Sequence, residues 1–204
     1  MVEQRTDEWL AERIGKITAS RVYALLEKTM KGMPTAGRAS LIKELIVERL
    51  TGDCKEIFVN RAMQRGIELE PMARTEYEMR HGVMVIETGF VPHPEIDGIG
   101  ASPDGLVGND GLIEIKCPET WTHLEVIKSG EAPPQYIAQM QLQMACTGRA
   151  WCDFVSFDDR LPSKLAYFER RVMRDEAYIA NMVAECQLAL KEINEYIQAL
   201  ESKV

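Results

Sequence analysis

The chain has 204 residues, of which 46% are hydrophobic and 27% are charged. This length and composition are typical of one globular domain, and we expect residues 1–204 to form a single domain. No apolar run approaches the roughly 18 residues of a membrane span, and the N-terminus lacks a signal-peptide pattern, so we expect a cytoplasmic protein without membrane contact. The formal net charge of −8 argues against an evenly basic surface of the kind that binds nucleic acids.

The cysteines are odd in number and contain no Cys-x-x-Cys pair. This spacing argues for reduced thiols and against a zinc site or an iron–sulfur cluster. The five residues are Cys54, Cys117, Cys146, Cys152 and Cys186.

The N-terminal segment predicts two helices and a candidate anion site. Thr6 and the acidic residues after it indicate a helix over residues 6–13. A second helix should begin near residue 21, with Thr18 or Ser20 as its N-cap. The free N–H groups of such a helix start suit a phosphate, and Arg13 could add a bidentate contact; simple helix capping is the alternative.

Two longer helices should follow a basic loop over residues 28–38, which either touches a DNA backbone or is solvated. Apolar residues at helical spacing predict a helix over residues 39–50. Asn60 should cap another helix that runs from residue 61 towards residue 80. Its predicted apolar face consists of Met63, Ile67, Met72 and Tyr77.

Short strands are expected over residues 83–87, 89–91 and 99–101, and a hairpin comes directly after them. The loop Gly-Asn-Asp-Gly at residues 108–111 is rich in residues that tolerate positive φ, which is typical of a tight turn. The run that follows it, residues 112–117, alternates with the period of a strand.

Alternation in this run places Ile113, Ile115 and Cys117 towards the core and puts Glu114 and Lys116 together on the other face. A solvated ion pair is the ordinary explanation of a Glu-x-Lys pair. Asp104 lies across the hairpin, however, and two carboxylates beside a lysine are suited to Mg²⁺-assisted phosphodiester hydrolysis. We expect Asp104 and Glu114, with the backbone carbonyl of Ile115, to hold two Mg²⁺ ions.

The C-terminal half predicts helices over residues 120–128 and 135–146, and then strands over residues 151–157 and 165–172. A long final helix begins at Asp175, and its heptad-like apolar residues could pack on the same domain or on a partner, with the end beyond about Glu195 most open to a partner. These elements predict an α/β (α+β) fold, in which a central mixed β-sheet is flanked by helices.

The chain resembles a known family at this point. Pro103, Asp104, Glu114 and Lys116 are similar to the PD-(D/E)xK nuclease signature, and the wider sequence resembles the phage lambda-type alkaline exonucleases, also called YqaJ-like viral recombinases. The signature alone is degenerate, but four blocks match in the expected order. They cover residues 13–20, 65–70, 101–118 and 136–141.

The resemblance implies a restriction-endonuclease-like core and assigns further site residues. Arg13, Ser20 and Ser102 would receive the 5′-phosphate of the digested strand. Glu70 and Gln139 would lie beside the strand carboxylates. Met63 would be an apolar wedge that splays the duplex end, or else a core methionine.

The resemblance also implies an activity, partners and a setting. The activity would be processive 5′-to-3′ digestion of one strand of double-stranded DNA, which releases 5′-mononucleotides and leaves a 3′ single strand for recombination. Mg²⁺ would be required, with Mn²⁺ as a substitute. The enzyme would form a ring-shaped homotrimer and work beside a single-strand annealing recombinase, encoded by a phage or prophage in a bacterial cytoplasm.

Three alternatives share some of these features. Another PD-(D/E)xK endonuclease would use Asp104, Glu114 and Lys116 without the phosphate site. A non-catalytic DNA-end-binding protein would not need the complete acid and lysine set. An iron–sulfur exonuclease would need a cysteine cluster, which the sequence lacks.

Overall fold

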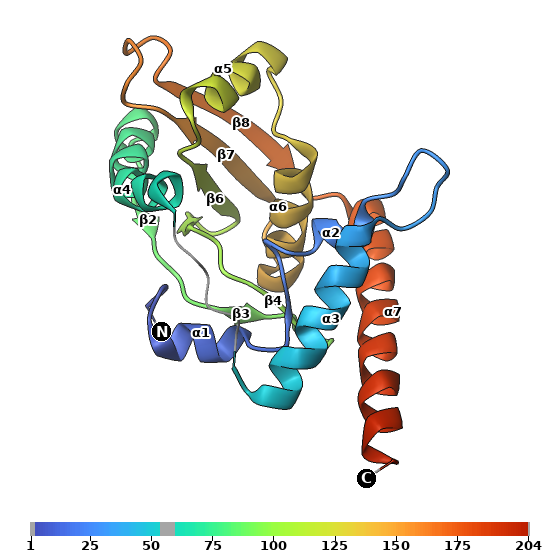
Figure 1. The fold of residues 1–204 in the computed structure, drawn as a ribbon. Helices are drawn as coiled ribbons and strands as arrows, with labels where there is room; N and C mark the ends of the chain where they lie inside the picture. The colour runs from blue at the N-terminus through green and yellow to red at the C-terminus, as the bar shows by residue number, and fades with distance from the viewer. Residues whose placement is uncertain (1–2, 54–59, 204) are drawn as a thin grey trace.

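A computed structural model describes residues 3–53 and 60–203, in which helices surround a five-stranded and a three-stranded sheet (Figure 1). Among these residues, no helix is both long and apolar enough to cross a bilayer. The elements in chain order are α1 (Asp7–Arg13), β1 (Ile17–Thr18), α2 (Tyr23–Leu26), α3 (Ala36–Thr51), α4 (Arg61–His81), β2 (Val85–Ile86), β3 (Val91–Pro92), β4 (Ile99–Ala101), β5 (Gly105–Val107), β6 (Gly111–Lys116), α5 (Thr120–Ser129), α6 (Pro134–Thr147), β7 (Trp151–Phe157), β8 (Tyr167–Met173) and α7 (Glu176–Glu201).

Both sheets are mixed, which confirms the predicted fold class. The larger sheet has the order β2-β5-β6-β7-β8, with β6 and β7 parallel and the other neighbours antiparallel. The predicted hairpin forms its centre as β5 and β6. The smaller sheet has the order β1-β4-β3, in which β1 and β4 are parallel. The strand expected at residues 83–87 is shorter than predicted, and the one expected at residues 89–91 is shorter and ends one residue later, at Pro92.

Strand β6 is buried on both faces, and its alternation follows the prediction. Ile113 and Ile115 pack in one hydrophobic cluster with Tyr77 of α4. Leu112, on the opposite face, packs in another cluster with Met140 of α6. Glu114 belongs to the face of Leu112, so helix α6 covers the side of the strand that carries this carboxylate (Figure 1).

Side-chain caps begin three of the helices at the predicted positions. Thr6, Asn60 and Asp175 accept hydrogen bonds from backbone N–H groups in the first turns of α1, α4 and α7. Each such cap contributes about 1 kcal/mol to the stability of its helix, because it satisfies a donor that has no partner inside the helix. The cap at Asn60 therefore helps to fix the start of α4, which carries Glu70.

The helix predicted to begin near residue 21 is present as α2, but its predicted cap at Thr18 or Ser20 is wrong. Residues 17–18 form strand β1, and the short helix α2 starts after Val22 without any side-chain cap. Backbone N–H groups of Ile17 and Ala19 donate to the carbonyls of Gly98 and Gly100, and both side chains are buried. Pairing with β4 and burial of these two residues therefore override the local capping preference.

The predicted apolar face of α4 is also wrong, apart from Tyr77. The buried residues of the helix are Leu69, Ala73 and Tyr77, which follow one another at intervals of four. Met63 and Met72 are 44% and 53% exposed, respectively. The exposure of Met63 excludes its alternative assignment as a core methionine.

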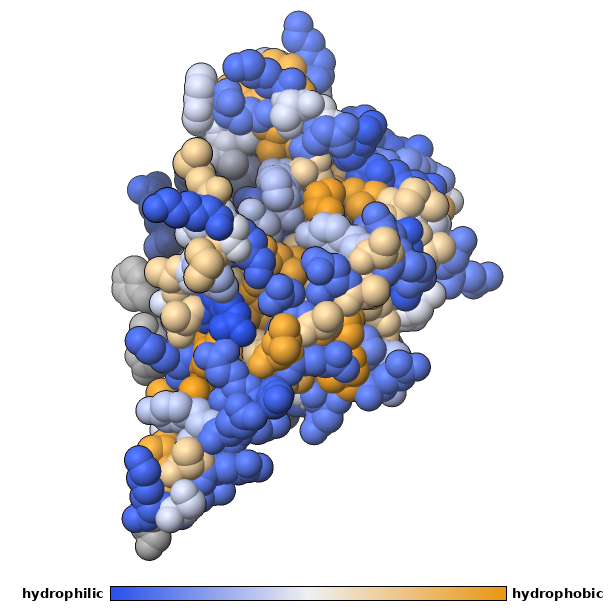
Figure 2. Space-filling view, turned by 90° about the vertical axis from the view of Figure 1, so that its right-hand side faces the viewer, coloured by the Kyte–Doolittle hydropathy of each residue, from blue (hydrophilic) through white to orange (hydrophobic). Residues whose placement is uncertain are grey.

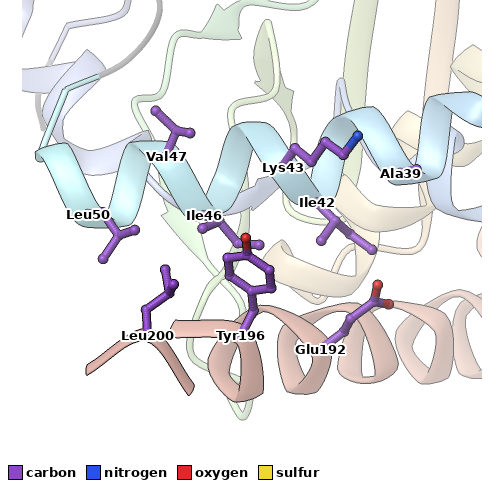
Figure 3. Close-up of a pocket in the computed structure, with 9 residues that line it drawn as sticks. All are labelled: Ala39, Ile42, Lys43, Ile46, Val47, Leu50, Glu192, Tyr196 and Leu200. Carbon is purple, nitrogen blue, oxygen red and sulfur yellow. The ribbon is translucent and has the colours of Figure 1, made fainter. Parts of the chain in front are cut away.

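Helix α7 packs on its own domain along most of its length, against α2, α3 and α6. From Glu192 onward, its last turns and α3 form a groove of about 550 Å³, in which Ile46 and Leu50 point toward Tyr196 and Leu200 (Figure 3). Figure 2 shows that apolar groups on the face in view lie in patches among hydrophilic side chains. A partner at the end of α7 stays a prediction.

The four described cysteines, Cys117, Cys146, Cys152 and Cys186, are free thiols. Cys54 lies outside the described residues.

A buried polar network joins α4 to strands β7 and β8. The hydroxyl of Tyr77 donates to Asp153 Oδ2 at 2.7 Å, and Arg171 donates to both oxygens of this carboxylate at 2.8 Å. Asp153 is fully buried, so each of these bonds offsets part of the cost of removing the charge from water. The network fixes the C-terminal half of α4 against the sheet.

Tyr77→Phe should lower the free energy of unfolding by about 1.5–3 kcal/mol, because it removes one hydrogen bond to a buried carboxylate. Chemical denaturation followed by circular dichroism measures this change. Tyr196→Phe removes a hydroxyl from a half-exposed ring and should change stability by less than about 0.5 kcal/mol. Equal effects of the two variants would contradict a stabilising role for the bond to Asp153.

Candidate active site

Three of the predicted catalytic side chains meet where the hairpin strands β5 and β6 lie next to each other. Asp104 immediately precedes β5, and its Oδ2 accepts a hydrogen bond from the backbone N–H of Ile115 at 2.7 Å. Lys116 forms an ion pair with Glu114 Oε1. The structure therefore brings both carboxylates and the lysine together, as the spacing predicts.

Glu114 is fully buried and is held by helix α6. Gln139 Nε2 donates to Glu114 Oε1 at 2.7 Å, and Gln143 Nε2 donates to Oε2 at 2.6 Å. Gln139 thus lies beside the carboxylate, where the family resemblance places it. Gln143 was not among the site residues that the sequence predicted. Its position four residues after Gln139, on the same helix face, is the signal that could have identified it.

Burial and the neighbouring charges shift the pKa values of Asp104 and Lys116. Burial raises the pKa of Asp104 well above its usual range, and the Glu114 carboxylate raises it further, although Lys116 acts in the opposite direction. Burial alone would lower the pKa of Lys116, but the carboxylates of Glu114 and Asp104 raise it overall. Lys116 therefore stays an ammonium ion at neutral pH.

Glu70 of helix α4 also lies near the strand carboxylates and Lys116. It lines a pocket of about 420 Å³ together with Arg5, Ile115, Lys116 and Met63. Its carboxylate pairs with Arg5, and with Arg74 at 3.1 Å. Its negative charge also contributes to the raised pKa of Asp104. Glu70 thus faces the strand carboxylates while two arginines partly neutralise it.

The donor set at this site fits a hard divalent cation. Asp104, Glu114 and the backbone carbonyl of Ile115 supply oxygen atoms, the ligands that Mg²⁺ prefers. A cation here would also relieve the charge repulsion that raises the pKa of Asp104. Among the described residues, no group of three or more His, Cys, Asp or Glu side chains is arranged to hold a metal. Both Glu114 oxygens already accept hydrogen bonds, so an ion at Oε1 would compete with Lys116 and Gln139.

The predicted phosphate-binding residues form a second cluster. Arg13, at the end of α1, donates from Nη1 to Ser102 Oγ at 3.1 Å and from Nη2 to Ser20 Oγ at 3.5 Å. The hydroxyl of Thr18 lies 3.3 Å from that of Ser20. One guanidinium and three hydroxyl groups thus meet, and we call this cluster of Arg13, Thr18, Ser20 and Ser102 the anion socket. Its hydroxyls come from strand β1, the turn after it and the residue that follows β4, not from the helix N-terminus that was predicted.

Trp9 supports the anion socket and was missed in the sequence. Its indole N–H donates to Ser102 Oγ at 3.0 Å, and the guanidinium carbon of Arg13 lies 4.1 Å from the centre of its ring. This cation–π contact holds the arginine against α1. The spacing of four residues between Trp9 and Arg13 on one helix is the signal that could have identified it.

The two clusters lie side by side because they share one segment of chain. We call Asp104, Glu114 and Lys116 the carboxylate cluster. Ser102 belongs to the anion socket, and Asp104, two residues later, belongs to the carboxylate cluster. Pro103 between them accepts a hydrogen bond from the side chain of Gln4 at 2.8 Å through its carbonyl. The N-terminal segment therefore braces the link between the two clusters.

Comparisons with known proteins identify the family and related structures. Residues 8–150 match the model of the YqaJ-like viral recombinase domain. An alkaline exonuclease (LHK-Exo) from Laribacter hongkongensis is 54% identical, with a TM-score of 0.91 and 97% of each chain covered; in complex with dAMP its TM-score is 0.92. A phage-related exonuclease from Haemophilus somnus is 19% identical over 91% of this chain and 96% of that one, with a TM-score of 0.71, which shows a shared fold.

A viral relative matches over a smaller part of its length. The uncharacterized protein R354 of Acanthamoeba polyphaga mimivirus is 27% identical over 169 residues, which are 75% of this chain. The chain spans 29% of that relative's length. The matched domain covers more than half of the chain, including both clusters, and the chain belongs to the YqaJ-like viral recombinase family.

Proposed function

We propose that this protein is a Mg²⁺-dependent exonuclease that digests one strand of linear double-stranded DNA from a 5′-phosphorylated end. Membership of the YqaJ-like viral recombinase family and the likeness to an alkaline exonuclease support a nuclease. One observation supports the end-directed form of this activity. The carboxylate cluster and the anion socket share residues 102–104, so a bound terminal phosphate would lie next to the hydrolytic groups.

The anion socket suits a terminal 5′-phosphate. Arg13 offers a planar guanidinium, whose paired N–H groups match phosphate oxygens, and Ser20 and Ser102 offer hydroxyl donors. A phosphate held there would fix the register of the strand, and cleavage of the next bond would release a 5′-mononucleotide. The complex of LHK-Exo with dAMP, a nucleotide of the size of this product, supports the assignment.

Each side chain of the candidate active site would have its own role in hydrolysis. Asp104, Glu114 and the carbonyl of Ile115 are proposed to hold two Mg²⁺ ions, for which Mn²⁺ could substitute. When bound, these ions would acidify the attacking water and stabilise the leaving 3′-oxygen. The Lys116 ammonium would hold the nucleophilic water and offset charge at the phosphorus. Glu70 and Gln139 would orient the water or the DNA from the pocket wall.

The proposal also includes a role for Met63 at the DNA end and the partners of the protein. Met63 is exposed and lines the candidate pocket, which suits an apolar wedge at the duplex end. The resemblance supports a ring-shaped homotrimer, which would keep the enzyme on its DNA, and a single-strand annealing recombinase that receives the 3′ strand. It also supports action in the cytoplasm of a bacterial host.

A time course on linear duplex DNA, labelled separately at each 5′ and 3′ end, tests the direction of digestion. With Mg²⁺, we expect early release of the 5′ label as a mononucleotide and late release of the 3′ label. Covalently closed circular DNA should remain intact. Cleavage of closed circles would instead identify an endonuclease, and DNA binding without any release would identify a non-catalytic end-binding protein.

Lys116→Ala should lower the rate constant of cleavage by about 10²- to 10³-fold, because it removes a charge next to the reacting phosphate. DNA binding should persist, since the anion socket stays intact. Single-turnover release of labelled nucleotide measures the rate, and fluorescence anisotropy measures binding.

Lys128→Ala is the matched control, because Lys128 is a highly exposed lysine at the end of α5. It should cleave at the wild-type rate. Undiminished turnover in Lys116→Ala would remove this lysine from the mechanism.

Arg13→Ala should abolish the preference for 5′-phosphorylated over 5′-hydroxyl ends. A hydrogen bond to a charged group contributes about 1.5–3 kcal/mol, which corresponds to a roughly 10- to 100-fold loss in the ratio of the two rates. Competition between the two substrates in one reaction measures this ratio. Arg170→Ala, which removes an exposed arginine paired with Glu131, should leave the ratio unchanged. An unchanged ratio in Arg13→Ala would make Arg13 a structural residue.

A further inference from the structure

Gln143 is a fully buried polar side chain that the proposed chemistry does not use. Its Nε2 donates to Glu114 Oε2 at 2.6 Å, and its Oε1 lies 3.9 Å from the sulfur of Cys152, which can donate a weak hydrogen bond. Because an ionised carboxylate only accepts hydrogen bonds, the N–H₂ end of the amide faces Glu114 and its oxygen is left to the thiol. Gln143 thus lies on the core side of Glu114.

The two oxygens of Glu114 therefore have different surroundings. Oε1 faces Lys116, which lines the candidate pocket, and also accepts the bond from Gln139. Oε2 faces the core and is held by Gln143. A carboxylate anchored at one oxygen keeps a single rotamer and presents the other oxygen in a fixed direction.

We propose that Gln143 is a positioning residue, which anchors the core-facing oxygen of Glu114 and so aims the other oxygen at the site of the divalent cation. This inference rests on the proposed function and extends it to a residue that cannot touch DNA. Without the anchor, Glu114 would lose a donor while fully buried, and its carboxylate would turn toward the remaining donors, Lys116 and Gln139. The affinity for the cation would fall because its ligand would no longer be preorganised.

Helix α6 offers a matched control two residues away. Gln141 is also buried, but its amide donates to the carbonyl of Met173 at 2.8 Å and its oxygen accepts from the N–H of Asp175 at 2.9 Å. These partners lie where β8 leads into α7, and Gln141 has no bond to Glu114. Gln141→Met therefore removes a buried amide from the same helix while leaving the carboxylate cluster unchanged.

The experiment measures Mn²⁺ binding to the full chain in the absence of DNA, by electron paramagnetic resonance of the free ion. Gln143→Met should weaken Mn²⁺ affinity by about 10- to 100-fold, the usual effect of removing a group that orients a metal ligand. Gln143→Asn keeps the polarity but shortens the reach, and should weaken the affinity in the same direction. Gln141→Met should bind Mn²⁺ with wild-type affinity, even if it unfolds at a lower temperature.

The outcomes separate this inference from the function on which it rests. If the wild-type protein binds no Mn²⁺, the metal-dependent function fails, and the positioning role fails with it. If the wild type binds Mn²⁺ and a folded Gln143 variant binds it equally well, only the positioning role is overturned. Equal weakening in Gln141→Met would also overturn it, because the effect would then reflect general loosening of α6.

Discussion

The buried carboxylate of Glu114 is the constraint on which the rest of the structure depends. A charge removed from water is strongly destabilising unless it is paired and hydrogen-bonded. Here the lysine two residues along the same strand supplies the counter-charge, and two amides of helix α6 supply the remaining donors. Because all three donors must meet one carboxylate, helix α6 and strand β6 are held in a single relative position.

The same constraint explains how two clusters with different chemistry lie next to each other. Strand β6 pairs with β5, and Asp104 precedes β5 while accepting a bond from the backbone beside Glu114. Ser102 lies two residues earlier, at the end of β4, and receives Arg13 from α1. The chain therefore places a group that suits a phosphate beside groups that suit a cation. Arg13 lies in the anion socket and Lys116 lies beside the carboxylates, so each cluster contains a basic group although the net charge of the chain is −8.

Strictly local patterns were sufficient to predict much of the fold. Alternation along residues 112–117 predicted the correct face of the strand for Glu114. The caps at Thr6, Asn60 and Asp175 predicted the starts of three helices. Both signals depend only on residues that are neighbours in the sequence. The cap expected at Thr18 or Ser20 was wrong because β4, about 80 residues away, pairs with residues 17–18. The predicted apolar face of α4 was wrong because packing against the sheet determines which residues of the helix are buried.

In the candidate site, too, contacts between residues close in the sequence could be predicted and contacts between distant residues could not. The pairing of Asp104 with Glu114 and Lys116 could be predicted, because one hairpin carries all three. The gathering of Arg13, Ser20 and Ser102 came from the family resemblance, since 82 residues separate the second from the third and no pattern in the chain connects them. Gln143 and Trp9 were missed because each acts by holding another side chain, so that their spacing of four residues from Gln139 and Arg13 was the one signal that the sequence offered.

The most direct test of the central claim is a crystal structure of the protein with Mn²⁺ and a duplex that carries a 5′-phosphate. We expect anomalous scattering from Mn²⁺ in contact with Asp104 and Glu114, and a terminal phosphate within hydrogen-bonding distance of Arg13. Ions bound elsewhere, or a terminal phosphate held away from Arg13, Ser20 and Ser102, would contradict this claim.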